Sequence, residues 1–459
     1  MIMLQHLGKR DAVYITENRV TLQSLFLPIL LESLLKNLLN TVNVLILSNL
    51  SDKAVAAVGV ASQLITMVLM LYTVTGVGAS VVISQNLGAG NRKAAADTSA
   101  VAVVLVAVLS IFLGIIFVFF APQLLTLMQL QEDLMPDGLV YLRVVGGLFI
   151  FEAVQSVLSA VMRSHGYAKH AMAAVIMANI LNAFGCYLVV YQPIKIPLMG
   201  VLGVACARVM SAIITLIISI MMMVRMNIWP DFRCLIPIPT KLVGNVLRVA
   251  LPHSVSSFSY NFSQTVSTAI ISSLGAVAVS SKIYVSNIVV YVYIATSALG
   301  SAVSILVGRL VGAGKSDDAY RLCMKYLKVG ILCSVTFSFI AILLRYPLIG
   351  LFTRDKEIME LAAFIMTLDI FVEIGRGINL VVGNSLTASA DVKFPAVVSI
   401  CSAWGCSILL SYVLGVRMGL GLAGCWIAFA VDELFRGIIL IIRWKSRQWQ
   451  RNNLVIDNV

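Results

Sequence analysis

Acidic side chains stand inside long apolar segments of this chain, at Glu32, Glu152 and Glu373. Apolar surroundings disfavour the charged form of a carboxyl group unless a cation, a proton or a hydrogen-bond donor compensates it. Such acids therefore pair with a basic side chain or bind a mobile cation. Both options stay open for each residue, and the mobile cation would be a proton or a sodium ion.

Glu152 differs from the other two acids because no basic residue lies within four positions of it. Glu32 precedes Lys36 by four residues, which is the favourable order for an ion pair on a helix. Glu373 precedes Arg376 by three, so these two side chains can also pair. We therefore expect Glu152 to be the leading ion-coupling residue, with a hydrogen bond to a neighbouring helix as the alternative.

Two further groups of charges are expected to have structural roles. Asp369 lies one helical turn before Glu373, on the face that also carries Arg376, so the three can share their charges. A second group near the end of the last apolar segment is expected to neutralise itself, and it consists of Asp432, Glu433 and Arg436.

The composition indicates which class of protein holds these residues in position. Of the 459 residues, 60% are hydrophobic and 12% charged, and the mean hydropathy is +0.97. A soluble domain is about 25% charged, so a soluble enzyme or a disordered chain is excluded. The net charge of +12 is scattered through short gaps rather than clustered, which argues against nucleic-acid binding. Eight cysteines without a CxxC pair and four histidines without metal-site spacing predict no metal and no cofactor.

The apolar segments predict an all-α polytopic membrane protein with twelve transmembrane helices. Each segment is long enough for the roughly 20 residues that a spanning helix needs. The expected spans are 22–48, 54–84, 94–120, 139–162, 171–192, 199–225, 246–273, 278–308, 319–345, 357–385, 394–416 and 420–442.

Lys and Arg predict the orientation of these spans. The two tails and the loops after even-numbered spans hold 21 of them, against 8 for the loops after odd-numbered spans. Positive loops stay on the inside, so both termini are expected in the cytoplasm and the protein in the plasma membrane. The expected organisation is a tail (1–21), a first lobe (22–225), a cytoplasmic linker (226–245), a second lobe (246–442) and a C-terminal tail (443–459).

The two halves repeat each other at a shift of 224 residues. Leu27–Ala56 aligns with Leu251–Ser280, and LGAGN at Leu87–Asn91 aligns with VGAGK at Val311–Lys315. Each half has six spans and begins on the same side, so the repeat is parallel. Two such lobes around a midplane cavity are typical of secondary transporters, which alternate access by rocking one lobe against the other.

Polar stripes mark the expected cavity, although packing between helices is the alternative. The first span carries Glu32, Lys36, Asn40 and Asn43 on one face, and the shift of 224 gives Ser256, Tyr260, Gln264 and Ser267. Aromatic rings beside amides suit lipophilic cations. The remaining cavity candidates are Asn287 and Tyr291 in the eighth span, together with Gln155 and Arg376. The shift of 224 relates Gln155 to Asn379, and it relates Arg376 to Glu152.

These features resemble the bacterial multidrug and toxic compound extrusion (MATE) family of cation antiporters. The resemblance rests on NVLILSNLSDKAVAAVGVASQL (Asn43–Leu64), on the paired glycine-rich segments SQNLGAGN (Ser84–Asn91) and SILVGRLVGAGK (Ser304–Lys315), and on NSLTASADVKFP (Asn384–Pro395). It covers about residues 22 to 443.

The resemblance also implies which positions carry ion coupling in that family. Many members have an aspartate where this chain has Asn43, and sodium-coupled members have acids where it has Tyr260 and Arg376. Asn182 fits an amide that the family uses in its first lobe, and Cys186 stands where an acid or amide is common. Coupling must then use the other carboxylates, for which Glu32, Glu152 and Glu373 are available.

The expected function is an antiporter, active as a monomer, that exports organic cations in exchange for protons or sodium ions. The alternative is a flippase for lipid-linked precursors from the same broader superfamily. Such a flippase should line its cavity with several cations, whereas the charge count assigns only Lys36, Arg208, Arg376 and Arg436 to the spans and the other basic residues to the loops and span ends. No HExxH or GxSxG motif occurs in a span, so an intramembrane enzyme is not expected.

Overall fold

The computed structural model describes residues 20–48, 52–192, 200–236 and 239–456, and almost all of this part is helical. The chain divides into two compact units. Of the described residues, those within 27–87 and 91–250 make up one unit, the first lobe. Those within 20–26, 88–90 and 251–456 make up the other, the second lobe.

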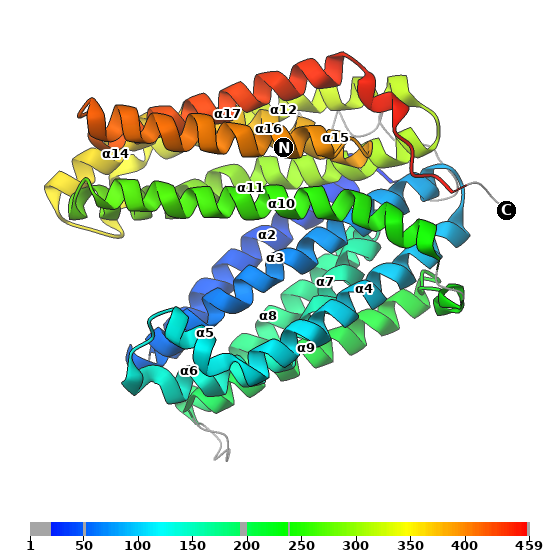
Figure 1. Cartoon of the computed structure of the whole chain (residues 1–459), viewed down its shortest axis with the longest axis horizontal. Coiled ribbons are helices and arrows are strands. Elements are labelled where there is room, and N and C mark those ends of the chain that lie inside the picture. The colour runs from blue at the N-terminus through cyan, green and yellow to red at the C-terminus, as the bar shows by residue number, and fades with distance from the viewer. Residues whose placement is uncertain (1–19, 49–51, 193–199, 237–238, 457–459) are drawn as a thin grey trace. The chain divides into compact units, whose positions relative to one another are not determined.

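The first half of the chain forms long helices in which α8 and α9 lie side by side (Figure 1). The elements are α2 (Leu22–Ser48), α3 (Asp52–Gly88), α4 (Arg92–Phe119), α5 (Ala121–Leu127), η1 (Glu132–Leu134), α6 (Met135–Tyr141), η2 (Leu142–Gly146), α7 (Ile150–Ser164), α8 (Ala168–Tyr191), α9 (Gly200–Arg225) and η3 (Phe232–Leu235).

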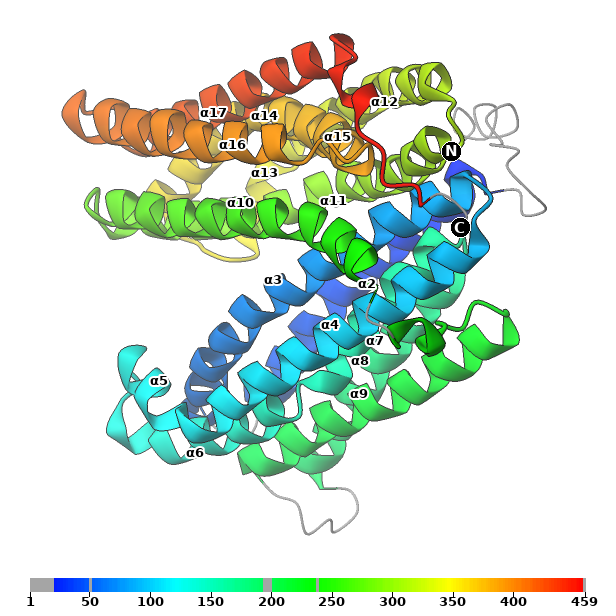
Figure 2. The same ribbon diagram turned by 45° about the vertical axis from the view of Figure 1, so that its right-hand side comes forward.

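The second half repeats this pattern, with α14 packed along α17 and α11 along α12 (Figure 2). The elements are α10 (Thr240–Ser272), α11 (Ala276–Gly312), α12 (Ser316–Leu343), α13 (Arg345–Gly350), α14 (Lys356–Ile378), η4 (Asn379–Gly383), α15 (Asn384–Ala388), α16 (Lys393–Ser402), η5 (Ala403–Ile408), η6 (Ser411–Arg417), α17 (Gly421–Lys445) and η7 (Gln448–Arg451).

Within the described residues, eight helices are long and apolar enough to cross a membrane. A ninth span counts if Glu132–Gly146 and Ile150–Ser164, which meet at 46°, are taken together. The other three predicted spans correspond to α10, α14 and α17, which carry more polar or charged side chains. The prediction of an all-α polytopic fold with two six-helix lobes is confirmed, and its three most polar spans all belong to the second half.

Small residues allow the helices of the first lobe to pack closely. Its core contains many fully buried alanines, among them Ala57, Ala61, Ala95, Ala102 and Ala153. Helices in lipid gain little from the hydrophobic effect and depend on such close van der Waals packing. The large apolar side chains on the outer faces, such as Phe112 and Ile115 of α4, are more than half exposed, as expected for surfaces that meet lipid.

Candidate functional site

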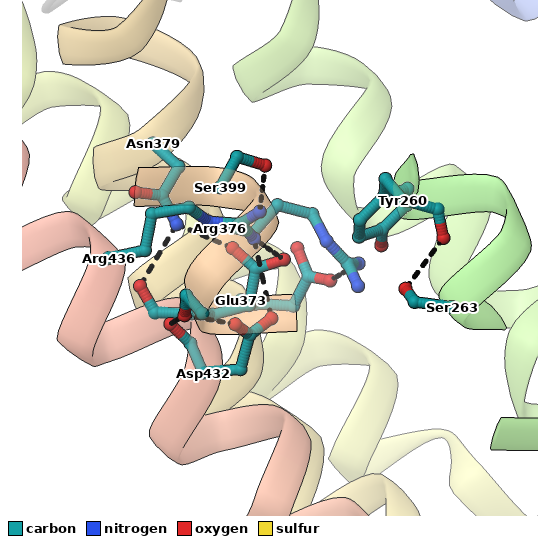
Figure 3. A network of polar contacts seen from close by, with 10 residues as sticks. Tyr260, Ser263, Glu373, Arg376, Asn379, Ser399, Asp432 and Arg436 are labelled. Atoms are coloured by element: carbon teal, nitrogen blue, oxygen red, sulfur yellow. Dashed lines mark hydrogen bonds and ion pairs between the residues drawn. The ribbon is translucent and has the colours of Figure 1, made fainter. Parts of the chain in front are cut away.

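The charged residues of the second lobe gather where α14 and α17 approach most closely. The approach depends on Gly375, because a Cβ at this position would lie 2.6 Å from the carbonyl carbon of Glu433. Directly after this contact the helix widens into the π-helical turn η4, which begins at Asn379. π-helical turns often occur at functional positions in helices. The tight contact and the turn together bring the polar side chains of both helices into one network (Figure 3).

Glu373 and Arg376 form the centre of this network. The Nη1 of Arg376 donates to Oε1 of Glu373, which confirms the predicted pair three residues apart. Glu373 is fully buried, and its second oxygen, Oε2, has no hydrogen-bond partner among the described residues. The Arg376 guanidinium also lies 4.9 Å from the ring centre of Tyr293, at a distance that allows cation–π attraction.

On α17, Arg436 is held by both neighbouring acids. Its Nη2 lies 2.6 Å from Oε1 of Glu433 and 3.7 Å from Oδ2 of Asp432. The self-neutralising cluster predicted here is therefore present. Asn379 links it to η4, because its Nδ2 donates to the carbonyl oxygen of Glu433 at 2.9 Å and to Oε2 at 2.6 Å. The guanidinium of Arg436 also lies 5.8 Å from the ring centre of Tyr260.

Asp369 takes a different partner from the one that its spacing predicts. Its Oδ1 accepts a hydrogen bond of 2.9 Å from Nε1 of Trp426, and no ion pair reaches it within the described residues. Its side chain is only 5% exposed. Asp369 and Arg376 still attract each other electrostatically, so the predicted sharing of charge among Asp369, Glu373 and Arg376 is present, although only Glu373 forms an ion pair with Arg376.

A cavity of about 170 Å³ opens beside this network. Five elements line it, and the three polar spans α10, α14 and α17 are among them. The polar and aromatic lining residues are Tyr260, Gln264, Lys282, Ser286, Tyr293, Asp369, Arg376, Ser407, Trp426, Phe429, Asp432 and Glu433.

The charges in and around this cavity do not balance. The network contains four carboxyl groups (Asp369, Glu373, Asp432 and Glu433) and two arginines (Arg376 and Arg436). Two negative charges therefore remain in the network if all six groups are ionised, and one remains when Lys282, which also lines the cavity, is counted. Buried charge without compensation is costly, so the network favours binding of protons or of small or organic cations.

The first lobe contains a second ion pair, which corrects the expectation for Glu152. The Nη2 of Arg208 on α9 donates to Oε1 and Oε2 of Glu152, both at 3.1 Å. The Nη1 of Arg208 also donates to the hydroxyl of Tyr141 at 3.1 Å. Glu152 was expected to stand alone because it has no basic neighbour on its own helix. Its partner comes from a helix 56 positions later, which local spacing does not reveal.

Glu32 also pairs between helices rather than within one. Its Oε1 accepts from Nη1 of Arg163 on α7 at 3.0 Å. Lys36, the partner predicted from the spacing, is exposed. The expected pair on α2 is therefore wrong. Both carboxylates proposed for the first lobe thus have an arginine partner on another helix.

The remaining predicted residues fall into four groups. Tyr260, Gln264 and Arg376 line the cavity, whereas Asn287 and Tyr291 of α11 are exposed and lie outside its lining. Gln155 donates to Ser159 at 3.3 Å, and Asn182 lies 3.8 Å from the thiol of Cys186. The side chains of Asn40 and Asn43 lie outside the described residues.

Lys282 and Trp426 were missed from the sequence although both line the cavity. Lys282 lies near the start of its span, where a basic residue is ordinary. Trp426 lies in an apolar run, where an aromatic residue predicts packing. Among the described residues, no group of three or more His, Cys, Asp or Glu side chains has the arrangement of a metal site.

Comparison with known proteins agrees with this architecture. The model of the MatE family matches residues 28–188 and again residues 252–413. The second match begins 224 residues after the first, which is the shift of the internal repeat. The uncharacterized transporter YisQ of Bacillus subtilis (strain 168) is 34% identical over 430 residues, which cover 94% of each chain.

A probable multidrug resistance protein NorM of Thermotoga maritima is 25% identical, over 95% of this chain and 94% of its own length. A solved outward-facing multidrug resistance MATE transporter of the MOP superfamily superposes with a TM-score of 0.85 at 18% identity, over 93% of this chain and 95% of that chain. The same values hold for a MOP superfamily transporter of Pyrococcus furiosus, described as having a binding pocket of reversed polarity that suggests a different function.

The family match covers both lobes, and the solved structures share the fold. The resemblance inferred from the paired glycine-rich segments is thereby confirmed. The chain belongs to the MatE family of multidrug and toxic compound extrusion transporters, and it is a multi-pass membrane transporter rather than an enzyme.

Proposed function

We propose that this protein is a secondary antiporter that exports organic cations across the plasma membrane in exchange for protons or sodium ions. The observation that carries the proposal is the surplus of two carboxyl groups over arginines in the buried network of the second lobe. The multidrug resistance proteins among its relatives support the choice of drug-like substrates. Exchange would proceed by rocking of the two lobes.

Coupling is assigned to the second lobe, at Asp369 and Glu373. Glu32 and Glu152 in the first lobe each have an arginine partner within 3.1 Å, which lowers the need for a further cation. Asp369 accepts a hydrogen bond from an indole and takes part in no ion pair, and one oxygen of Glu373 has no hydrogen-bond partner among the described residues. A proton or sodium ion that neutralises these acids would leave when an organic cation replaces it. Competition between the two cations gives exchange rather than cotransport.

The orientation, location and assembly state are part of the same proposal. Both termini and the linker are assigned to the cytoplasm on the basis of the charge count. The protein is taken to act as a monomer in the plasma membrane, because each lobe brings its own half of the repeat.

The test uses the purified protein in liposomes with either a pH gradient or a sodium gradient imposed. Uptake of a cationic dye, such as rhodamine 6G, is expected to follow one of the two gradients. A rate of dye uptake that is independent of both gradients would overturn the antiport proposal. A parallel assay for scrambling of fluorescent phospholipids separates an antiporter from the flippase alternative, because only the flippase moves lipid.

A further inference from the structure

Two charged residues in the wall of the second-lobe cavity, Lys282 and Asp369, take part in no ion pair within the described residues. Lys282 of α11 donates from Nζ to the hydroxyl of Thr268 on α10, and no ion pair includes it. Asp369 of α14 accepts from the indole of Trp426, and no ion pair includes it either. All other ionised side chains in the lining, namely Arg376, Asp432 and Glu433, take part in ion pairs.

These two charges also form no ion pair with each other. The lining residues of α11 run from Lys282 to Tyr293, eleven positions that extend about 16 Å along a helix. Lys282 therefore lies at one end of the cavity along α11. No ion pair joins it to Asp369, although both face the same space. The same lining includes Val289 and Phe429, which offer apolar and aromatic contact.

A cavity with a separated cation and anion is complementary to a ligand with the opposite pair of charges. Charges in apolar surroundings gain most from a partner, because water compensates them poorly there. An ammonium or amidinium can approach Asp369, and a carboxylate can accept hydrogen bonds from the three donors of a lysine Nζ. A simple cation would satisfy only Asp369 and leave Lys282 without compensation.

We propose that this cavity is a subsite for zwitterionic substrates, in which Lys282 binds the anionic group and Asp369 binds the cationic group. The inference rests on the proposed function and narrows its substrate class from organic cations to organic cations that also carry an anionic group. The cationic end competes with the coupling ion at Asp369, whereas the anionic end adds affinity at Lys282 without affecting that competition.

Direct binding of two matched dyes tests the subsite without any gradient. Rhodamine B carries a carboxylate and a delocalised cation, and its ethyl ester is the same cation without the carboxylate. The purified protein is titrated with each dye, and binding is followed by fluorescence anisotropy. The wild-type protein is expected to bind rhodamine B at least about tenfold more tightly than the ester, as loss of one charge-assisted hydrogen bond predicts.

Variants at Lys282 assign this preference to the residue. Lys282→Gln should weaken binding of rhodamine B to the level of the ester and leave binding of the ester unchanged or tighter. Lys282→Arg keeps the charge and should retain the preference. Lys328→Gln is the matched control, because Lys328 is exposed on α12 of the same lobe and lies outside the cavity lining. It should leave both affinities unchanged.

Thermal unfolding of each variant separates loss of binding from loss of folding. The subsite is overturned if the folded wild-type protein does not prefer rhodamine B, or if folded Lys282→Gln keeps the preference. Failure of the antiport proposal is recognised separately, since it would appear as gradient-independent transport of the ester, a simple cation. Binding preference and gradient dependence are thus read from different ligands in different assays.

An anionic group paired with an ammonium also occurs in the head group of phosphatidylethanolamine. Competition with soluble glycerophosphoethanolamine distinguishes this source from free zwitterions. Displacement of rhodamine B from the wild type but not from the Lys282 variant would support the subsite with a lipid head group as its ligand. Rhodamine B binding that resists millimolar competitor would support the subsite with a free zwitterion as its ligand.

Discussion

The indole nitrogen of Trp426 donates a 2.9 Å hydrogen bond to the carboxylate of Asp369, and this bond joins α17 to α14 at the wall of the cavity. An indole provides one donor and no positive charge. It therefore holds the carboxylate in place and leaves its charge available to a second partner. Trp426→Phe should keep the ring packing but lose the hydrogen bond that orients Asp369. Substrate affinity should therefore fall, whereas the unfolding temperature should change little.

The two lobes are expected to respond differently when one acid becomes an amide. Asp369→Asn should abolish gradient-driven efflux, because the amide cannot be neutralised by a coupling ion. Glu152→Gln should retain gradient-driven efflux in the protein that folds, since Glu152 is already paired with Arg208 and is not assigned to coupling. Efflux from proteoliposomes measures both. Wild-type efflux from Asp369→Asn together with loss in Glu152→Gln would move ion coupling to the first lobe.

Glu373→Gln should lower the yield of folded protein, because it leaves Arg376 buried without its carboxylate. Breaking a buried pair from one side costs about 3–5 kcal/mol. Monodisperse protein recovered in detergent and its unfolding temperature are the measurements. The double variant Glu373→Gln with Arg376→Gln should recover much of the loss. Normal yield and an unchanged unfolding temperature would show that the pair with Arg376 adds no stability, and would leave Glu373 with its coupling role alone.

Gly375→Ala should separate α14 from α17 and disturb the Asn379 bonds to Glu433. The added Cβ would lie 2.6 Å from a backbone carbon of α17, and overpacking of this kind costs about 1–3 kcal/mol. Gly405→Ala is the matched control, because no heavy atom lies within 4 Å of its added Cβ. The unfolding temperature should fall for the first variant only. Equal unfolding temperatures for both variants would mean that the contact between α14 and α17 accommodates the added methyl group without loss of stability.

The linker offers a test of orientation. Ile236 is 90% exposed, so a membrane-impermeant maleimide should label Ile236→Cys only after cells are opened. The native Cys234 should interfere little. Burial, together with the negative charges of Asp97 and Asp231, raises the pKa of its thiol to about 11. At pH 7 its reactive thiolate is then about 100-fold scarcer than for an ordinary cysteine, and its labelling should accelerate as pH rises. Labelling of Ile236→Cys on intact cells would overturn the cytoplasmic assignment.

Trp449→Ala should destabilise the second lobe, because this ring anchors the end of the chain. It stacks on Trp444 with ring centres 4.2 Å apart, and both side chains are fully buried. Loss of a buried tryptophan costs about 3–5 kcal/mol. The unfolding temperature in detergent should fall accordingly, whereas Lys445→Ala at an exposed position nearby should leave it unchanged. An unaltered Trp449→Ala protein would show that the stack contributes no stability.

Sequence patterns predicted the parts of this molecule that depend on local spacing. The twelve spans and the repeat followed from apolar runs and a constant shift, and the pair of Glu373 with Arg376 followed from helical periodicity. Glu152 with Arg208, Glu32 with Arg163, and Asp369 with Trp426 could not be predicted in this way. Each joins two helices that are far apart in the chain, and helix rotation and register decide which side chains meet.

The charges of α14 and α17 have a consequence for how the chain enters the membrane during synthesis. Asp369, Glu373 and Arg376 lie inside one spanning segment and oppose insertion by roughly 8 to 10 kcal/mol when each group enters alone. The hydrogen bonds that join this segment to the last one, from Trp426 to Asp369 and from Asn379 to Glu433, need residues of α17 that are made only later. The tenth segment therefore depends on the last one for stable integration, and a nascent chain released before α17 emerges would leave α14 poorly retained in the bilayer.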